Sequence, residues 1–329
     1  MSYLIGVDGG GSKTTALIAG LDGAIIGRGI SGSSNYRAAG IESACQALDE
    51  ALRAAFAAAN LALQQDRLQQ DRLQEDQLQR NQLQPDQVQM ACFGLAGVDR
   101  PGDQAPLQAW AERQWPGMPV EFVSDARLVM AAGTPQGWGI EVICGTGSIV
   151  YGRSPEGQTR RAGGWGYLLG DEGSGYDIGL TALRCVARAD DGRGPQTTLT
   201  GRILARWSLA AARDLVGYVY GPQVSKTEIA ALAVLVERAA LEGDSVAQQI
   251  LRQAGRELAT GAQVVVERLQ LPEPTPCALA GGVLVQGELV SQELLTAASE
   301  LGLQLFPVQK VTEPAQGAIR LAAERLRQA

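Results

Sequence analysis

Two glycine-rich turns in this chain carry hydroxyl groups and follow apolar runs, an arrangement suited to holding an anion. They are VDGGGSKT at residues 7–14 and CGTGS at residues 144–148. Bare backbone N–H groups in such a turn can point at a phosphate, and neighbouring hydroxyls add donors. The first turn is not a Walker loop, because GxxxxGK[ST] is absent, and it is not a Rossmann fingerprint, because a second strand follows it instead of a helix. One such turn is equally typical of an ordinary hairpin, but two predict a pair of hairpins that grip one polyphosphate.

The groups expected to contact that anion come from both turns: Gly9, Gly10, Gly11, Ser12, Lys13 and Thr14 from the first, and Gly145, Thr146 and Gly147 from the second. A third small-residue turn, ALAGGV at residues 278–283, joins an apolar run to a helical pattern. Without side chains, Gly281 and Gly282 would let a flat ring such as adenine approach the backbone. Close helix–strand packing is the competing interpretation.

Two acidic residues stand at strand ends. Asp8 precedes the first glycine turn, where it could hold a hydrated Mg²⁺ ion, which keeps several waters and needs few carboxylates; a turn-capping role is the alternative. Asp125 ends the run Val120–Ser124, at the position where α/β proteins bind ligands. It is a candidate general base, or the N-cap of a following helix.

Composition narrows the chemistry further. The chain has no histidine, which excludes Ser-His-Asp and Cys-His catalysis and histidine metal sites. Its five cysteines are scattered without a CxxC pair, so we expect buried thiols in a reducing compartment. The net charge of −7 argues against nucleic-acid and anionic-membrane partners. With no membrane-length apolar run and no signal-peptide pattern, we expect a cytoplasmic protein.

The elements that must position these groups alternate between strands and helices, which indicates an α/β protein. The first 30 residues read as a three-stranded meander, with Asp22-Gly23 as a hairpin signal. Further strands are predicted at 89–95, 120–124, 139–144, 148–152 and 277–280, helices between the first three of these, a mostly helical stretch at 173–269 and a last helix at 315–327. At 329 residues the chain is long enough for two domains.

A tandem LQxDx repeat occupies residues 63–88 and places a leucine or valine at every fifth position. Five residues advance a helix by about 500°, so these side chains cannot form one apolar stripe. We interpret the segment as a duplicated insertion of helical propensity that extends the preceding helix, without a direct functional role.

The order of these motifs resembles the sugar kinase, heat-shock and actin superfamily. Within it, GGWGYLLGDEGS at residues 163–174 is similar to a signature of N-acetylglucosamine kinases, and it is the most specific of the motifs. Bacterial glucosamine kinases and the activator ATPases of 2-hydroxyacyl-CoA dehydratase and benzoyl-CoA reductase share parts of it. The resemblance covers the chain from Gly6 to about Ala323, apart from the repeat.

The resemblance implies two ribonuclease-H-like (actin-like ATPase) domains, each with a mixed sheet, and an interdomain cleft. The expected boundaries are 1–124, 125–312 and a final helix, 313–329, that packs back on the N-terminal domain. It also implies ATP and Mg²⁺ as cofactors and a homodimer. Asp125 corresponds to the catalytic base, Ser12 and Thr146 to nucleotide-contacting hydroxyls. The sugar contacts correspond to Asn35, Asp125, Gly164, Trp165, Gly166 and Asp171.

Two positions depart from the pattern, and the first, Ser12, stands where threonine is frequent and keeps the hydroxyl. Ala96 stands where vertebrate-type kinases carry a sugar-contacting serine, which leaves the identity of the sugar open. For Trp165 a core aromatic is the competing interpretation. The expected activity is ATP-dependent phosphorylation of the 6-hydroxyl of N-acetylglucosamine. Alternatives are a kinase for glucosamine or another amino sugar, an activator ATPase with a subunit-bridging iron–sulfur cluster, and a sugar-sensing regulator without turnover.

Overall fold

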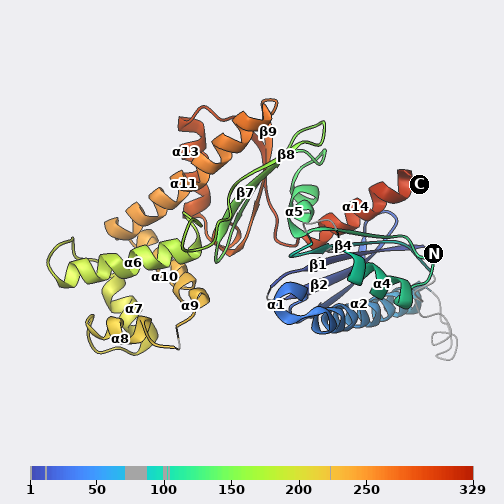
Figure 1. Ribbon diagram of the computed structural model, residues 1–329, viewed down its shortest axis with the longest axis horizontal. Coiled ribbons are helices and arrows are strands. Elements are labelled where there is room, and N and C mark those ends of the chain that lie inside the picture. The colour runs from blue at the N-terminus through green and yellow to red at the C-terminus, as the bar shows by residue number, and fades with distance from the viewer. Residues whose placement is uncertain are drawn as a thin grey trace. The chain divides into compact units, whose positions relative to one another are not determined.

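A computed structural model of the chain describes residues 2–11, 13–70, 87–98, 102, 104–222 and 224–328. The chain forms two compact units (Figure 1). The first unit combines Met1–Ala132 with Glu313–Ala329, and the second is Gly133–Thr312. The predicted boundary between residues 124 and 125 precedes helix α5 (Asp125–Gly133), whereas the observed division falls after Ala132, near the end of that helix.

The first unit holds one five-stranded sheet with helices on both faces (Figure 1). Its elements are β1 (Tyr3–Gly9), β2 (Thr14–Gly20), β3 (Ile25–Ser31), α1 (Tyr36–Ala39), α2 (Ile41–Gln70), β4 (Val88–Leu95), α4 (Ala105–Gln114), β5 (Val120–Ser124), α5 (Asp125–Gly133) and α14 (Ala315–Gln328). The strand order is β3-β2-β1-β4-β5. Strands β1 to β3 form the predicted antiparallel meander, and β4 and β5 add in parallel.

The two faces of β1 pack against different helices because successive side chains of a strand point to opposite sides. Ile5 and Val7 join the core under α2 and α4, whereas Leu4 joins the core under α5 and α14. Asp8 shares its alternation with Leu4 and Gly6, so it lies on the α5/α14 face. A Cβ on Gly6 would lie 2.7 Å from the Ile319 nitrogen, which shows how closely α14 approaches the sheet.

The second unit also holds a five-stranded sheet, with most of its helices inserted between β8 and β9. Its elements are β6 (Gly139–Cys144), β7 (Ser148–Arg153), β8 (Thr159–Gly163), α6 (Gly175–Asp190), α7 (Leu199–Trp207), α8 (Asp214–Val219), α9 (Lys226–Ala230), α10 (Ala233–Leu241), α11 (Ser245–Leu269), β9 (Thr275–Ala280), α12 (Gly282–Val285), α13 (Leu289–Glu300) and β10 (Leu305–Lys310). The strand order is β10-β9-β6-β7-β8.

The two sheets repeat one topology. In each, a three-stranded antiparallel meander (β1–β3 or β6–β8) continues through its first strand into two parallel strands (β4 and β5, or β9 and β10). The fold class expected from the sequence, α/β with two domains that each contain a mixed sheet, is confirmed. Each glycine-rich turn connects the first two strands of its sheet, so the repeated motif reflects a repeated fold.

Two strands were not expected. β8 has the sequence TRRAG and is mostly exposed, so it lacks the apolar alternation of a strand. β10 has the sequence LFPVQK, in which a proline interrupts the run. Both lie at sheet edges, where burial and backbone pairing demand least of the side chains.

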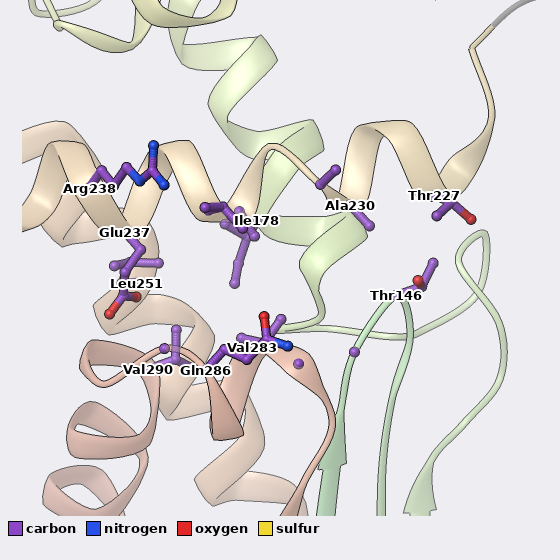
Figure 2. A pocket seen from close by; sticks show the side chains of 16 residues that line it. Thr146, Ile178, Thr227, Ala230, Glu237, Arg238, Leu251, Val283, Gln286 and Val290 are labelled. Carbon is purple, nitrogen blue, oxygen red and sulfur yellow. The ribbon is translucent and has the colours of Figure 1, made fainter. Parts of the chain in front are cut away.

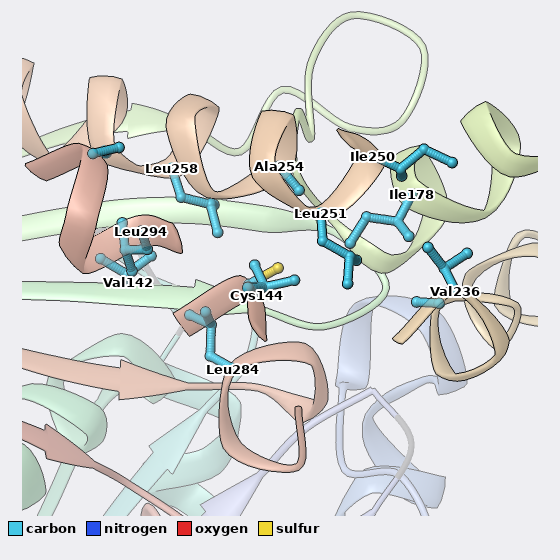
Figure 3. Packing of buried hydrophobic residues seen from close by; sticks show 14 of the residues in the cluster. Val142, Cys144, Ile178, Val236, Ile250, Leu251, Ala254, Leu258, Leu284 and Leu294 are labelled. Atoms are coloured by element: carbon cyan, nitrogen blue, oxygen red, sulfur yellow. The ribbon is translucent and has the colours of Figure 1, made fainter. Parts of the chain in front are cut away.

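The core of the second unit lies between its sheet and the long helix α11. Figure 3 shows Val142 and Cys144 from β6 packed with Leu251, Ala254 and Leu258 from α11. The other members of this cluster come from β7 and β9 and from the surrounding helices, among them α6, α10 and α13, so the strand that leads into the turn after Cys144 is anchored in a buried core.

The repeat segment is described only in part. Helix α2 continues through Gln70, so the start of the repeat extends the preceding helix as predicted. Residues 71–86 lie outside the described residues. Among the helices that the structure describes, none combines the length and apolar character needed to cross a membrane.

Candidate active site

Asp8 and Asp125 interact electrostatically within the first unit. Asp8 ends β1 on the α5/α14 face, and Asp125 begins α5 immediately after β5. Burial, reinforced by the negative charges of Asp125 and Glu313, raises the pKa of Asp8 from 3.8 to about 6, while Lys13 acts in the opposite direction. A largely buried carboxylate whose ionisation is disfavoured by burial and by a second negative charge is suited to holding a cation or an exchangeable proton.

Asp125 is positioned by its own helix and by the fold around it. Its Oδ1 accepts a hydrogen bond of 3.0 Å from the Ala126 N–H. Helix α5 packs directly on β4, as shown by the 2.2 Å that would separate a Cβ on Gly94 from Leu128 Cγ. Arg320 from α14 donates to the Ala131 and Ala132 carbonyls near the other end of α5. The N-terminus of α5 is therefore held at a defined place at the carboxyl end of the parallel strands.

A backbone hydrogen bond closes the first glycine turn, and the space beside Gly11 is unoccupied by other described residues. The Gly10 N–H donates to the Lys13 carbonyl over 3.0 Å, and Ser33 Oγ donates to the Gly10 carbonyl. A Cβ on Gly9 would lie 2.2 Å from Ser34 Oγ, so Gly9 is required by packing. Gly11 has no atom within 4 Å of the corresponding position, which leaves room above the turn.

The hydroxyl groups of this turn belong to Ser12 and Thr14. Ser12 lies outside the described residues. Thr14 is fully buried, and its hydroxyl donates to the Gly32 carbonyl over 2.7 Å. The expectation that this hydroxyl contacts an anion is therefore corrected: Thr14 holds the β2 start against the Gly32 loop. Spacing alone could not reveal this, because Gly32 is distant in sequence.

Asn35 caps the short helix α1 beside the loop that follows β4. Its Oδ1 accepts from the Arg37 N–H over 3.1 Å. The Arg37 Nε in turn donates to the Gly97 carbonyl over 2.9 Å, and the Ala96 N–H donates to the Gly9 carbonyl over 2.8 Å. These bonds join Asn35, the glycine turn and the Ala96 loop into one connected region of the first unit. The amide NH₂ of Asn35 has no hydrogen-bond partner within the described ranges.

The second glycine turn is supported by the N-terminus of α6. Gly175 donates its N–H to the Gly145 carbonyl over 2.8 Å, and the Gly145 N–H donates to the Gly147 carbonyl over 2.9 Å. Ser148 Oγ donates to the Glu172 carbonyl over 2.8 Å, which ties the turn to the GGWG…GDEGS segment. The turn is thus bound on two sides by hydrogen bonds from distant residues.

Asp171 lies against this turn. A Cβ on Gly147 would lie only 2.7 Å from Asp171 Oδ2, so glycine is needed there for the carboxylate to fit. Asp171 has φ +61°, a left-handed conformation that non-glycine residues seldom adopt and that is often found at functional sites. The structure therefore joins a residue expected at the sugar to a turn expected at the phosphates.

Trp165 is an exposed residue and not a core aromatic. Its side chain is 65% exposed, and Arg161 lies over its ring with the guanidinium carbon 5.6 Å from the ring centroid. Gly164 and Gly166 on either side have φ of +69° and +84°, which fixes a tight path for the loop. The core alternative for Trp165 is excluded.

A cavity of about 550 Å³ opens beside the second turn, within the second unit (Figure 2). Gly145, Thr146 and Gly282 form part of its wall, and helices α9 to α13 and the start of α6 supply the rest. Gly282 has no atom within 4 Å of a would-be Cβ, so its bare backbone faces open space. Gly281 has a different task, because a Cβ there would lie 2.3 Å from the Cys144 carbonyl oxygen. Its missing side chain serves strand packing.

Several cavity residues carry no sequence motif and were not anticipated. They are Thr227 on α9, Glu237 and Arg238 on α10, and Gln286 at the C-terminal end of α12. Figure 2 shows Glu237 and Arg238 on one side of the cavity and Thr146 on another. Glu237 Oε1 also accepts from the Glu288 and Leu289 N–H groups, each over 2.9 Å. Only the tertiary fold brings these helices together, so the sequence offered no signal for them.

The cavity has the size and character of a small-ligand site. Its volume falls within the range of typical ligand pockets, and its wall is mainly apolar with a few polar groups. Each unit thus presents a glycine turn after its first strand. In the first unit, two carboxylates that interact electrostatically, Asp8 and Asp125, accompany the turn. In the second unit, a ligand-sized cavity opens beside it.

Comparison with known proteins gives a consistent picture. The model of the BadF/BadG/BcrA/BcrD ATPase family matches residues 5–322. The N-acetylmuramic acid/N-acetylglucosamine kinase of Clostridium acetobutylicum is 35% identical over 285 residues, 86% of each chain. The N-acetyl-D-glucosamine kinase of Dictyostelium discoideum is 32% identical over 324 residues, 97% of each chain.

Solved structures agree on the fold. A candidate N-acetylglucosamine kinase from Chromobacterium violaceum superposes with a TM-score of 0.70 and 30% identity, over 98% of this chain and 99% of the other. A ROK family glucokinase from Streptomyces griseus, solved with glucose and AMPPNP, gives a TM-score of 0.55 at 19% identity and covers 100% of both chains. The second likeness concerns the fold alone.

Proposed function

The chain belongs to the BadF/BadG/BcrA/BcrD ATPase family, and from this we propose that it is an ATP-dependent amino-sugar kinase that phosphorylates the 6-hydroxyl of N-acetylglucosamine. The two curated relatives quoted above, both named as N-acetylglucosamine kinases, support this assignment. The absence of histidine is compatible with it, because phosphoryl transfer depends mainly on positioning and electrostatic stabilisation.

The coupling of Asp8 and Asp125 carries the proposal. A kinase needs a carboxylate that accepts the proton of the attacking hydroxyl, and Asp125 is our candidate for that base. Asp8 is the candidate residue for holding Mg²⁺. Its carboxylate is partly buried, has a raised pKa and interacts with a second carboxylate, which suits the binding of a hydrated cation. The bound cation would neutralise negative charge on the phosphate that is transferred. In this assignment the two acids have separate roles.

We assign the nucleotide to the glycine turns and to the cavity of the second unit. The adenosine moiety would occupy the cavity, with its ring against Gly282, and the N–H groups around Thr146 would be donors to the phosphates. Within the first unit, the N–H groups around Gly11 keep the phosphate-binding role that the sequence predicts. Glu237 and Arg238 are candidates for recognising polar groups of the nucleoside. The open sides of Gly11 and Gly282 support this placement.

We assign the sugar to Asn35, Asp125, Gly164, Trp165, Gly166 and Asp171. The Asn35 amide offers donors, the Asp171 carboxylate accepts hydroxyl hydrogens, and an exposed indole is suited to a pyranose ring. Ala96 supplies no polar contact at its loop. Because the Clostridium acetobutylicum relative is named for N-acetylmuramic acid as well, that sugar is a second candidate substrate.

A substrate panel with coupled detection of ADP tests the proposal. The panel contains N-acetylglucosamine, N-acetylmuramic acid, glucosamine, N-acetylmannosamine and glucose, each with ATP and Mg²⁺. We expect the N-acetylated glucosamine skeleton to give the highest kcat/KM. Preference for glucosamine or glucose would reassign the substrate.

The rival activator function is tested on the same preparation. An iron–sulfur cluster shared between subunits requires accessible cysteines, but the five cysteines of this chain are buried or only partly exposed. We expect an iron assay on protein purified without oxygen to be negative. Stoichiometric iron, together with ATP hydrolysis that no sugar stimulates, would favour the activator function.

A further inference from the structure

Arg161 lies on the edge strand of the second sheet, close to the segment assigned to the sugar. It pairs with Tyr151 across β7 and β8, and β8 ends at Gly163, directly before Gly164 and Trp165. β8 is an edge strand, and the side chains of Arg160 and Arg161 on it are exposed. Nothing in the catalytic assignment above uses this residue.

The side chain of Arg161 is held by stacking and not by a salt bridge. Its guanidinium lies over the Trp165 ring, 5.6 Å from the centroid. Within the described residues it forms no hydrogen bond or ion pair. Stacking occupies only the face of the guanidinium plane, so its N–H groups, which point outward in that plane, remain available for a ligand.

Acidic side chains surround the Trp165 segment on which the Arg161 guanidinium lies. The loop beyond Trp165 folds back through hydrogen bonds from Leu169 and Gly170 to the Gly166 carbonyl. This brings Glu172 close, because a Cβ on Gly170 would lie 3.1 Å from Trp165 Cβ and 3.4 Å from Glu172 Oε2. A ligand that carries a carboxylate would be repelled by Glu172 and Asp171 unless a cation offset them.

We propose that Arg161, held on the Trp165 ring, forms a subsite for a carboxylate substituent of the amino sugar. The indole would contact the sugar ring, while the guanidinium edge binds the acidic group with charge-assisted hydrogen bonds. Arg161 is then the residue through which the enzyme accepts an acidic amino sugar beside the neutral one. This inference rests on the assignment of Trp165 to the sugar in the proposed function.

Arg160 provides a matched control. It is the same residue type on the same exposed strand, but successive side chains of a strand point to opposite faces. Its Nη1 donates to the Thr159 carbonyl, whereas the guanidinium that lies over the Trp165 ring is that of Arg161. A non-specific effect of removing one positive charge would appear in both variants, whereas a subsite effect would appear only at Arg161.

The test compares kcat/KM for N-acetylmuramic acid and N-acetylglucosamine in the wild type, Arg161→Gln, Arg161→Lys and Arg160→Gln. We expect Arg161→Gln to lower the ratio of the two values, acidic over neutral, by about tenfold or more, the usual worth of a charge-assisted hydrogen bond. Arg160→Gln should leave the ratio unchanged. Arg161→Lys should retain part of the ratio, because lysine keeps the positive charge but cannot form the two parallel hydrogen bonds of a guanidinium.

Two results would overturn the inference while leaving the kinase assignment intact. One is a wild-type enzyme that phosphorylates N-acetylglucosamine but neither binds nor turns over N-acetylmuramic acid. The other is an equal effect of Arg161→Gln on both sugars. If the wild type phosphorylates no sugar, the proposed function fails. The subsite is then tested by calorimetric binding of N-acetylmuramic acid to the wild type and Arg161→Gln, where equal affinities would refute it.

Discussion

At the scale of single residues, the site combines groups that the sequence could identify with groups that it could not. Asp125 and Trp165 were predicted from strand ends and a motif, and Trp165 is exposed as a binding residue should be. Thr14 was assigned to an anion, yet its hydroxyl donates to Gly32. Glu237 and Arg161 had no motif, because their environment depends on helices and strands that meet only in the tertiary structure.

Asp8 should make the folded protein less stable at neutral pH than an uncharged residue would. Its pKa is raised to about 6 in the folded state from 3.8, so the unfolded chain ionises more readily and wild-type stability falls between about pH 4 and pH 6. We therefore expect Asp8→Asn to be equally stable near pH 4 and about 2 kcal/mol more stable at pH 7.5. The same variant should lose kinase activity.

Urea denaturation in metal-free buffer with EDTA at several pH values measures this difference. Asp190→Asn, which replaces an exposed carboxylate, serves as the control. A stability difference that does not change between pH 4 and pH 7.5 would contradict the assigned environment of Asp8.

At the scale of elements, close packing between helices and sheets depends on glycine at a few positions. Hydrophobic periodicity was sufficient to predict most strands and the last helix, because α14 has one apolar face that meets β1 and β4. The edge strands β8 and β10 were missed because edges do not require an apolar pattern. The same lack of constraint leaves β8 free to carry two arginines.

Gly6→Ala should weaken the attachment of α14 to the first sheet. The added methyl group would lie 2.7 Å from the Ile319 nitrogen and 2.8 Å from the Ala315 carbonyl oxygen, and these backbone atoms cannot move without shifting the helix. We expect a loss of about 1–3 kcal/mol in the free energy of unfolding, as for other overpacked sites.

Chemical denaturation of Gly6→Ala measures that loss, with Gly201→Ala as the control. Gly201 lies in α7 with no atom within 4 Å of a would-be Cβ, so alanine there should stabilise the helix by about 0.5–1 kcal/mol. Equal effects at the two positions would mean that α14 does not pack on Gly6 as described.

Gly282→Val should fill part of the cavity of the second unit without a large loss of stability. Gly282 begins α12 and faces open space, so the added side chain meets the ligand and not the protein. We expect the dissociation constant for ATP to rise at least about tenfold, through loss of close approach to the ring. Calorimetric titration measures it. Unchanged ATP affinity would place the nucleotide elsewhere.

At the scale of the whole molecule, the duplicated sheet topology explains why two similar turns recur in one sequence. Their repetition could be predicted from the motifs, because a Gly/hydroxyl turn between apolar runs predicts a hairpin wherever it occurs. The assignment of helices to the two units could not be predicted in the same way. Most helices of the second unit are inserted between β8 and β9, and no strand between them marks where one ends and the next begins. The family match over residues 5–322 spans both units.

The leucine repeat should contribute little to the activity of the molecule. Because a five-residue spacing forms no single apolar stripe on a helix, replacing Leu73, Leu78 and Leu83 by glutamine interrupts no continuous apolar face. We expect kcat/KM for N-acetylglucosamine to stay within about threefold of the wild type, because no site residue belongs to the repeat. A larger loss in steady-state assays would assign the repeat a functional role.

The single-turnover rate of Asp125→Asn with ATP, Mg²⁺ and saturating N-acetylglucosamine tests the central claim most directly, because it isolates the transfer step from substrate binding. Retained ATP affinity and an unchanged circular dichroism spectrum would show that the variant is folded. The account predicts a fall of about 10²–10⁴-fold in the rate, the usual worth of a general base. A rate close to that of the wild type would show that another group accepts the proton of the sugar hydroxyl.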